Sequence, residues 1–418
     1  MTRRVKLKEV CREITVGHVG PMADQYVENG IPFLRSQNVM PFRLDGSNLK
    51  YISDSFHQRL KKSALGPGDV VVVRTGYPGT ACVIPDRLLV ANCADLVVIR
   101  PSSEINGHFL SCIFNSAWGK SAVAGSLVGV AQQHFNIGVA KEMLINLPPI
   151  EVQQRIASIL SAYDDLIENN TRRIKILEEM AQRIYREWFV HFRFPGHENV
   201  RMVESELGPI PEGWASGVLR DVCESVDYGY TTSAIKEAVG PKFLRITDIV
   251  PQTIDWRDVP HCKAPEKNAD RYRLREGDIV VARTGATTGY AKRLNKHHPL
   301  AIFASYLVRL RIKPQFSNCL YGVLAQSDDY KNFIKANWSG AAQPQANAQV
   351  LTSIPIVIPP PQLHQTFSAL AEPILDMSEN LQIRNANLRA TRDLLLPKLI
   401  SGEISVEALE PELVAPTS

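Results

Sequence analysis

A nine-residue stretch occurs twice in this chain with little change. Residues 68–76 have the sequence GDVVVVRTG, and residues 277–285 have GDIVVARTG, 209 positions later in a chain of 418 residues. Three further pairs match in the same order: LKEVC (7–11) with LRDVC (219–223), PFLRSQNV (32–39) with KFLRITDI (242–249), and AQQHFN (131–136) with AQPQAN (342–347). The period is far longer than that of solenoid repeats, so it predicts a duplicated domain.

Each copy, residues 1–150 and 214–361, has the pattern of an α/β domain. Short β-branched runs bounded by turn residues predict buried strands. Four such runs are Asp69–Arg74, Leu96–Arg100, Asp278–Arg283 and Tyr306–Ile312. Two longer segments are predicted to be helical, Asn106–Trp118 and Phe316–Asn337.

A different pattern follows the first copy. No proline occurs between Pro149 and Pro195, and apolar residues recur there with alternating spacings of four and three. The positions are Ile156, Leu160, Tyr163, Ile167, Asn170, Ile174, Leu177, Ala181, Ile184 and Trp188. This heptad seam predicts a helix over 151–190, and its one polar member, Asn170, is of the kind that sets register. Such a helix is roughly 58 Å long, more than a typical domain is wide.

A second, less regular seam follows the second copy, over 362–405. Phe367, Ile374, Leu381, Leu388 and Leu395 recur every seven residues, with Leu370, Met377, Arg384 and Thr391 at the positions between them. Pro373 predicts a kink in the first turns. We expect the two helices to pair as an antiparallel coiled coil, which gives the duplicated chain a pseudo-twofold arrangement. The alternative is that each helix lies on its own globular domain.

Composition limits the class of protein. Hydrophobic residues make up 44% of the chain and charged residues 22%, which excludes global disorder. No stretch has the ~20 apolar residues of a membrane span, and the first residues lack the apolar core of a secretory signal. The seven cysteines form no C-x-x-C pair, which favours free thiols in a cytoplasmic protein over disulfides or a zinc site.

Charge alternates along the chain. Residues 1–150 carry 16 Lys and Arg against 11 Asp and Glu, and residues 214–361 carry 19 against 13. The helical segment with its linker, 151–213, carries 8 against 11, and residues 362–418 carry 4 against 8. Two modestly basic domains favour contact with a polyanion, although differences of this size also arise by chance. The segment 191–213 is predicted to be a linker, and 406–418 a flexible acidic tail.

Catalytic signatures are missing from the sequence. GKS at 119–121 lacks the glycine that a phosphate-binding loop needs five positions earlier, where Phe114 stands. No G-x-G-x-x-G follows a strand, and the Asn/Asp-Pro-Pro-aromatic motif of amino-methyltransferases is absent. His297 and His298 are adjacent rather than helically spaced, which is not typical of a metal site. We therefore predict a binding protein that holds no metal and no cofactor of its own.

The layout resembles the specificity subunit of type I restriction–modification systems over essentially the full chain. The two GD-strand-RTG stretches match that family's signature in its target recognition domains. Four further stretches resemble its conserved helical regions and linker: LPPIEVQQRIASIL (147–160), EEMAQRIYREWF (178–189), LGPIPEGW (207–214) and LLLPKLISGEI (394–404). The polar seam positions and Pro373 depart from a regular second helix and put its straightness in doubt.

The resemblance implies a non-catalytic subunit that recognises a bipartite, asymmetric sequence in double-stranded DNA. It implies two methyltransferase subunits as partners, with S-adenosylmethionine bound in those subunits, and nuclease–translocase subunits that join them in some complexes. Two recognition domains on a stiff spacer fit two half-sites less than two DNA turns apart. The alternatives are a stand-alone DNA-binding regulator, and a scaffold whose coiled coil is the functional part.

Candidate DNA-contacting residues follow from the loops of each copy. Arginine contacts phosphates and guanine, and Asn and Gln recognise adenine. In the first copy they are Arg35, Ser36, Gln37, Asn38, Arg74, Thr75, Gly76, Tyr77, Gln132, Gln133 and Asn136. In the second copy they are Arg245, Thr247, Asp248, Arg283, Thr284, Gly285, Thr287, Thr288, Gln343, Gln345 and Asn347.

Two alternatives stay open for these residues. Arg74 and Arg283 occur in both copies, so they either position DNA through its phosphates or tie their loops to the frame. The polar loop residues either read bases or cap nearby elements. Tyr77, opposite Ala286, is a candidate for a contact specific to the first copy. Trp188 and Phe189 either contact the methyltransferase subunit or close the end of the helical pair.

Overall fold

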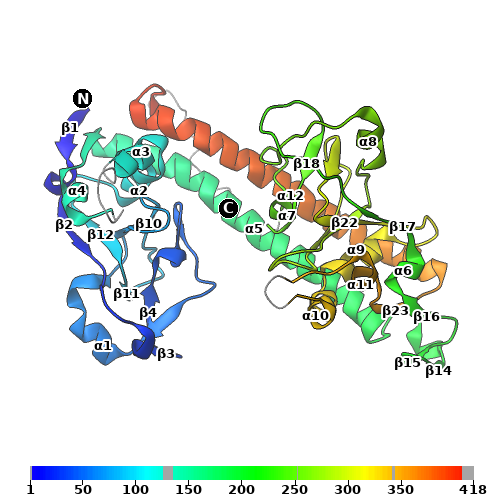
Figure 1. The fold of residues 1–418 in the computed structure, drawn as a ribbon. Helices are drawn as coiled ribbons and strands as arrows, with labels where there is room; N and C mark the ends of the chain where they lie inside the picture. Colours follow the sequence, from blue (N-terminus) through cyan, green and yellow to red (C-terminus); the bar gives the residue numbers. More distant parts are fainter. Residues whose placement is uncertain (1, 126–134, 252, 341–343, 407–418) are drawn as a thin grey trace. The chain divides into compact units, whose positions relative to one another are not determined.

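The chain folds into two compact units. The structure, a computed structural model, describes residues 2–125, 135–251, 253–340 and 344–406. Unit one comprises Met1–Asn169 and Asn387–Ser418, and unit two comprises Asn170–Ala386. Two long helices, α5 (Ile150–Tyr185) and α12 (Pro361–Ser401), therefore contribute residues to both units (Figure 1).

Unit one contains two main sheets. An antiparallel sheet has the order β10-β9-β12-β2, with β2 (Cys11–Val16), β9 (Val70–Val73), β10 (Ala81–Val83) and β12 (Leu96–Pro101). The other has the order β3-β7-β4-β11-β8, with β3 (Tyr26–Val27), β4 (Ile31–Leu34), β7 (Lys50–Ile52), β8 (Ala64–Leu65) and β11 (Ala91–Cys93). The smaller elements are β1 (Arg3–Lys6) paired with β13 (Leu144–Leu147), β5 (Val39–Met40) paired with β6 (Arg43–Leu44), α1 (Asp54–Arg59) and α4 (Ile137–Glu142).

Unit two repeats this topology. In its four-stranded sheet, β20 (Ala291–Arg293), β19 (Ile279–Ala282), β22 (Leu307–Ile312) and β17 (Cys223–Tyr228) take the places of β10, β9, β12 and β2. The parallel pair β18 (Lys242–Leu244) and β21 (Ala301–Phe303) repeats β4 and β11, and β16 (Ala215–Val218) with β23 (Pro355–Ile358) repeats β1 and β13. Three short helices complete the unit: α6 (Leu219–Val222), α7 (Ile246–Ile249) and α8 (Glu266–Arg271). The predicted duplication is confirmed in the order of the strands.

The repeated valine run is buried because both faces of its strand are covered. Val70 and Val72 belong to a core that includes residues of α5 and α12, whereas Val71 and Val73 belong to a separate core against the second sheet. Ile279–Ala282 divides its side chains between two cores in the same way. A strand covered on both faces carries a continuous apolar run instead of an alternating one.

Both ranges predicted to be helical are helical, and each is divided between two helices. Asn106–Trp118 is occupied by α2 (Gly107–Asn115) and the start of α3 (Ala117–Gly125), and Phe316–Asn337 by α9 (Asn318–Gln326) and α10 (Asp328–Asn337). The break falls at a serine in both. Ser116 Oγ accepts a hydrogen bond from the Gly119 N–H at 3.0 Å, and Ser327 Oγ accepts one from the Tyr330 N–H at 3.1 Å. A serine that caps the second helix in this way favours a new helix start.

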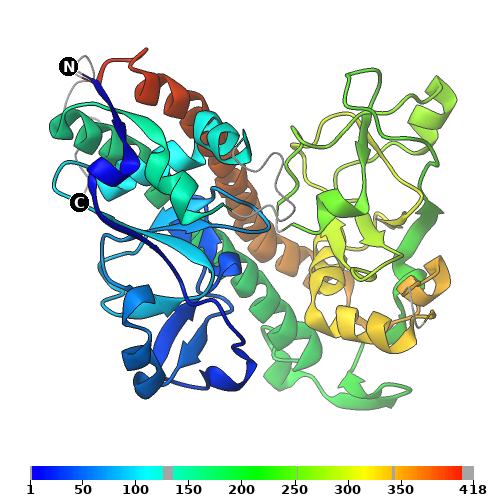
Figure 2. The same cartoon turned by 60° about the vertical axis from the view of Figure 1, so that its left-hand side comes forward.

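Helix α5 carries the predicted seam on its buried face. Every seam position from Ile156 to Trp188 is buried or half-buried. Leu166 and Ile176, which lie outside the seam, are 52% and 55% exposed. After Tyr185 the helix continues into a π-helical turn, Arg186–Val190. Figures 1 and 2 show the start of α5 beside the C-terminal part of α12 in unit one, where Ile156 and Leu160 share a core with Leu396 and Leu399.

The predicted seam of α12 is wrong at every second position. Phe367, Ile374, Leu381, Leu388 and Leu395 are buried or half-buried, as expected. However, Leu370 and Met377 are 46% and 50% exposed, and Arg384 and Thr391 are exposed. The inward positions are one residue later, at Ala371, Ser378, Asn385 and Arg392. Helix α12 continues through Pro373, which is exposed.

Polar contacts join α5 and α12 inside each unit. In unit two, Asn170 Nδ2 donates to Asn385 Oδ1 at 2.9 Å, and Gln382 Nε2 donates to Glu178 Oε1 at 3.3 Å. In unit one, Arg392 forms an ion pair with Asp164, and its Cζ atom lies 4.7 Å from the centre of the Phe42 ring. These pairs explain why the buried face of α12 is not an apolar stripe.

The segment predicted as a linker also builds part of unit two. Phe194 and Ile210 are buried in its core, and Trp214 packs on Phe192 and Phe194 at centroid distances of 5.6 and 5.2 Å. Residues Met202–Ser205 (β14) and Gly208–Pro211 (β15) form an antiparallel hairpin. The segment therefore packs as structure instead of only connecting two domains.

Candidate nucleic-acid interface

The Arg-Thr-Gly turn of unit one is tied to its own frame. Arg74 Nε donates to the Phe135 carbonyl at 3.0 Å, and Arg74 Nη1 forms an ion pair with Asp95. Thr75 Oγ1 donates to the other Asp95 oxygen at 3.3 Å. Gly76 has φ +86°, which suits a glycine at the tip of a tight turn. For Arg74 the loop-holding alternative describes what its side chain does in the structure.

The equivalent turn of unit two holds its arginine differently. Arg283 forms no ion pair among the described residues, and its Nε atom is buried there without a hydrogen-bond partner. Its Cζ atom lies 4.9 Å from the centre of the Tyr228 ring. The backbone of the turn is fixed instead. Ala346 N–H donates to the Arg283 carbonyl at 2.9 Å, and Gly285 N–H donates to the Pro344 carbonyl at 2.9 Å.

The threonines of that turn have separate places. Thr288 is buried, and its hydroxyl donates to the Gly285 carbonyl at 2.8 Å. Thr284 forms a backbone bridge with Gln345, and Thr287 is half-buried. Thr288 therefore shapes the turn, while Thr284 and Thr287 lie nearer its surface.

In the turns after β4 and β18, most of the side chains predicted to contact DNA form hydrogen bonds within their own turn. Asn38 is buried and accepts a hydrogen bond from the Arg35 N–H at 3.1 Å. Asp248 accepts from the Arg245 N–H at 2.8 Å and forms an ion pair with the Arg245 guanidinium at 2.8 Å. That pair raises the pKa of Arg245, first through the hydrogen bond to Asp248. Gln37 and Thr247, at equivalent positions, are exposed, and Ser36 is half-buried.

The predicted amide-rich loops divide between caps and exposed positions. Asn136 accepts from the Val139 N–H at 2.9 Å, and Asn347 accepts from the Val350 N–H at 2.8 Å, so each caps a short helix: α4, and α11 (Ala348–Thr352). Gln345 is exposed. Gln132, Gln133 and Gln343 lie outside the described residues. The capping role fits a general property of asparagine at helix starts.

The most exposed aromatic residue near these turns is Tyr77, whose side chain is 84% exposed at the tip of the unit-one loop. Unit two places three tyrosines around its turn that sequence inspection did not single out: Tyr228, Tyr290 and Tyr306, 43%, 40% and 61% exposed. Of the three, Tyr290 lies near the repeated motif in the sequence. The first copy has Val16 and Thr80 at the positions of Tyr228 and Tyr290, and it has no counterpart of Tyr306.

Trp188 and Phe189 lie inside unit two. They are 8% and 5% exposed and pack on Phe367 at centroid distances of 6.1 and 5.2 Å. Phe189 also lies 5.9 Å from Trp214. Their packing matches the alternative in which they close the end of the helical pair.

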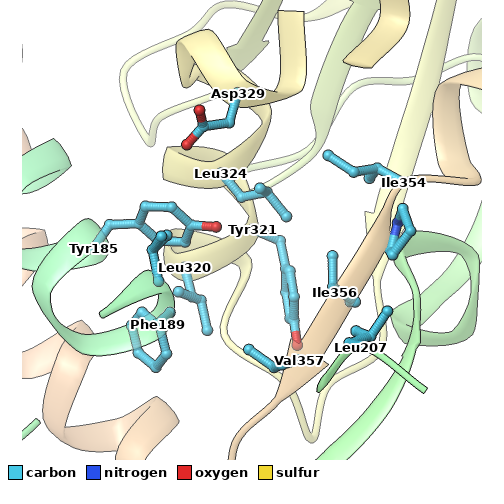
Figure 3. A pocket seen from close by; sticks show the side chains of 12 residues that line it. Tyr185, Phe189, Leu207, Leu320, Tyr321, Leu324, Asp329, Ile354, Ile356 and Val357 are labelled. Carbon is cyan, nitrogen blue, oxygen red and sulfur yellow. The ribbon is translucent and has the colours of Figure 1, made fainter. Parts of the chain in front are cut away.

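A cavity of about 280 Å³ lies beside this aromatic cluster in unit two. Figure 3 shows Tyr185 from α5 and Tyr321 from α9 at its walls, with Ile356 and Val357 of β23 opposite. The Tyr321 hydroxyl is buried and has no hydrogen-bond partner among the described residues. Burial raises the pKa of Tyr185, and the nearby Asp329 carboxylate adds to this.

Two ion pairs, in which Arg293 alone is largely buried, connect α12 to the end of β20 and the turn after it. Arg293 pairs with Glu372 at 3.1 Å, and Lys296 pairs with Asp376 at 2.9 Å. Burial raises the pKa of Glu379 to about 7, although the Asn295 side chain and Arg293 act to lower it. Burial also lowers the pKa of Lys292.

In the described residues, no group of three or more His, Cys, Asp and Glu side chains is arranged to hold a metal ion. None of the helices in the described ranges is long and apolar enough to cross a membrane.

The comparison with known families decides the assignment. A family model described as "Type I restriction modification DNA specificity domain" matches residues 4–179 and 211–371. The chain belongs to this family. The two matched ranges correspond to the two copies of the repeat, each with part of the helix that follows it.

Individual relatives agree with the family. A type I restriction enzyme MjaIX specificity subunit from Methanocaldococcus jannaschii is 29% identical over 324 residues, which cover 74% of this chain and 72% of the relative. The MjaVIII specificity subunit from the same organism is 25% identical over 395 residues, covering 93% and 89%. The EcoKI specificity subunit of Escherichia coli is 20% identical over 409 residues, covering 92% and 85%.

A solved structure shares the fold. The crystal structure of the type I restriction–modification S subunit from M. genitalium aligns with a TM-score of 0.56 at 13% identity, covering 96% of each chain. At this identity the likeness concerns the fold alone. The family match confirms the predicted family, and the shared fold agrees with the predicted architecture.

Proposed function

We propose that this chain is the DNA-recognition subunit of a type I restriction–modification complex, in which each unit recognises one half of a bipartite, asymmetric DNA target. The observation that carries this is the repeated topology with divergent loops. Both units carry the same Arg-Thr-Gly turn after the equivalent strand of equivalent four-stranded sheets, yet the side chains around the two turns differ. Two frames with different surfaces fit two different half-sites.

The paired helices serve as the spacer in this proposal. The contacts Asn170–Asn385 and Trp188–Phe367 in unit two support an antiparallel coiled coil, because residue numbers rise along α5 as they fall along α12. A stiff helical pair fixes the separation of the half-sites, as dimeric DNA-binding proteins do through their dimer interface. It also offers a surface for the methyltransferase subunits.

In this proposal, partner subunits catalyse the methylation and cleavage of the DNA. Two methyltransferase subunits bind S-adenosylmethionine and modify the DNA, and nuclease–translocase subunits join them where the system restricts. The chain itself contributes recognition and no catalytic group. The free cysteines, most of them buried, support a cytoplasmic location, where thiols stay reduced.

The test is a methylation map. The chain is expressed with the methyltransferase subunit encoded beside it, in a host that lacks modified adenine, and N6-methyladenine is located by sequencing. We expect a single motif of two different short half-sites around a fixed gap. Exchange of residues 1–150 for those of a relative should change one half-site and leave the other.

Two outcomes contradict the proposal. If both proteins fold and associate but no methylation appears, the chain does not direct a methyltransferase. Sequence-specific binding by the chain alone would then favour a stand-alone regulator, and absence of DNA binding would favour a scaffold.

A further inference from the structure

We propose that the two copies of the Arg-Thr-Gly turn have different jobs. Arg283 of unit two donates hydrogen bonds to two adjacent acceptor atoms of the DNA. Arg74 of unit one only holds its own loop. The inference rests on the DNA-recognition function proposed above and assigns one contact residue within it. From sequence the two arginines are equivalent, so the distinction comes from their surroundings.

Two donor atoms of Arg74, Nε and Nη1, bind acceptors of its own unit. The Phe135 carbonyl takes Nε, and the Asp95 carboxylate takes Nη1 and compensates the charge. Its side chain is 17% exposed. Asp95 has φ +50°, a left-handed conformation that aspartate tolerates better than most residues. Two of its three guanidinium nitrogens are thus engaged and its charge is compensated, which makes it a weaker ligand for a phosphate.

Unit two lacks the residue that neutralises this arginine. Two residues, Ala94 and Asp95, connect β11 to β12, whereas three, Ala304, Ser305 and Tyr306, connect β21 to β22. The longer connection carries no carboxylate. Arg283 therefore keeps its positive charge without an ion-pair partner among the described residues.

An aromatic ring supports Arg283 instead. Its Cζ atom lies 4.9 Å from the centre of the Tyr228 ring, and the Tyr228 hydroxyl accepts a hydrogen bond from the Ala348 N–H at 3.0 Å. The counterpart of Tyr228 in the register of unit one is Val16, so that unit has no such support. Stacking on a ring orients the guanidinium plane. The Nε atom of Arg283 is buried without a partner, so the two Nη groups are the donors that a ligand would meet.

This arrangement suits DNA. An oriented guanidinium donates two parallel hydrogen bonds, which match either two phosphate oxygens or the O6 and N7 atoms of guanine. The backbone of Arg283 is held at both sides, by Tyr306 through the Arg283 N–H at 3.0 Å and by Ala346 through the Arg283 carbonyl at 2.9 Å. A donor group fixed before binding loses little entropy when DNA arrives.

The experiment compares the two arginines in the full chain assembled with its methyltransferase partner. Variants R283A and R74A are matched, because they make the same change in the same motif. Dissociation constants for target and unrelated DNA are measured by fluorescence anisotropy at several salt concentrations. We expect R283A to bind target DNA about 10- to 100-fold more weakly, the scale of one lost bidentate contact. R74A should melt at a lower temperature but bind, once corrected for the folded fraction, within about threefold of wild type.

The pattern of loss identifies the acceptor. Equal weakening on target and unrelated DNA, with a salt slope lower by about one, assigns a phosphate. Relaxed methylation at one base pair of one half-site assigns a guanine. Both results support the inference.

Further variants keep the inference testable if R283A folds poorly. R283K retains the charge but loses the planar fork, so it should bind between wild type and R283A. Tyr228→Leu should weaken binding and change the salt slope or the methylated motif, whereas Tyr228→Phe keeps the ring and should change neither. The inference is overturned if folded R283A or R283K binds as wild type, or if R74A loses as much affinity as R283A. If wild type itself shows no sequence preference, the proposed function fails with it.

Discussion

The side-chain amide of Asn170 on α5 donates a hydrogen bond of 2.9 Å to the side-chain oxygen of Asn385 on α12. Asn385 is 2% exposed, and its own Nδ2 donates to Thr171 Oγ1 at 3.2 Å. The Asn385 side chain therefore accepts from Asn170 and donates to Thr171, both on α5, in a place that water does not reach freely. Removing one partner of such a buried polar pair lowers the stability of the protein, whereas replacing both partners with apolar side chains has a much smaller effect.

Replacing one partner should destabilise the protein. Asn170→Leu removes the donor to Asn385 Oδ1 and leaves that atom buried without it, so we expect the free energy of unfolding to fall by about 1–3 kcal/mol. The double variant Asn170→Leu/Asn385→Leu should recover most of the loss. Urea denaturation of the two single variants and the double variant measures the coupling.

Asn387→Leu is the matched control, because Asn387 lies on the same helix but is exposed. Its free energy of unfolding should stay within about 0.5 kcal/mol of wild type. Strictly additive effects of the two single substitutions at Asn170 and Asn385 would show that the pair is not coupled.

The stability should depend on pH through Glu379. Burial raises its pKa from 4.5 to about 7, so between these values the folded protein holds a proton that the unfolded chain has released. The contribution of Glu379 to the free energy of unfolding is therefore greatest below pH 4.5, and it declines as the pH rises to about 7. Glu379→Gln should remove this decline and stabilise the protein at pH 8 by on the order of 1 kcal/mol, discounted for partial exposure.

Thermal melts of Glu379→Gln between pH 5 and pH 8 test this. The exposed loop carboxylate Glu237 gives the control Glu237→Gln, which should keep the wild-type pH profile. An unchanged profile for Glu379→Gln would mean that the carboxyl titrates near its ordinary value.

Two buried tyrosines of unit two should respond oppositely to loss of the hydroxyl. Tyr321 has a buried hydroxyl with no partner among the described residues, beside the cavity of Figure 3. Tyr330 donates to the Leu351 carbonyl at 2.8 Å. Tyr321→Phe should therefore be neutral or stabilise by up to about 1 kcal/mol, whereas Tyr330→Phe should cost about 1–2 kcal/mol. Calorimetry of both variants checks the difference, and a loss of stability in Tyr321→Phe as large as that in Tyr330→Phe would contradict it.

Tyr77 should matter for DNA and not for folding. Its side chain is 84% exposed at the loop tip of unit one, so Tyr77→Ala should leave the melting temperature unchanged. Affinity for target DNA should drop about tenfold, the scale of one lost base contact. The methylation map of the variant should relax in the half-site assigned to unit one by the exchange of residues 1–150. Relaxation in the other half-site would remove Tyr77 from the unit-one interface.

The sequence predicted the elements whose pattern matches their burial. Val70–Val73 and Ile279–Ala282 are strands covered on both faces, and their apolar runs indicated this directly. The α5 seam was predictable for the same reason, since nine of its ten members are apolar or aromatic. The duplication was visible because the frame residues of both units are alike.

The sequence misled where a polar residue is buried against a partner far along the chain. Ser378, Asn385 and Arg392 face inward on α12, whereas the apolar Leu370 and Met377 are about half-exposed. A choice of apolar residues therefore gave the wrong residue at every second position of the seam. The helix breaks at Ser116 and Ser327 depend on caps that look like ordinary helical serines in sequence. Arg74 and Arg283 could not be told apart, because Asp95 and Tyr228 are remote from the motif.

Unit one is assembled from both ends of the chain, and this sets an order on its folding during synthesis. Its core contains Leu396, Leu399 and Val406 together with Ile156 and Leu160. A ribosome that has made the first 386 residues has synthesised all of unit two but not the C-terminal segment of unit one. The domain translated first is thus the one completed last, and until then the nascent chain exposes an apolar face of α5 that a chaperone has reason to cover.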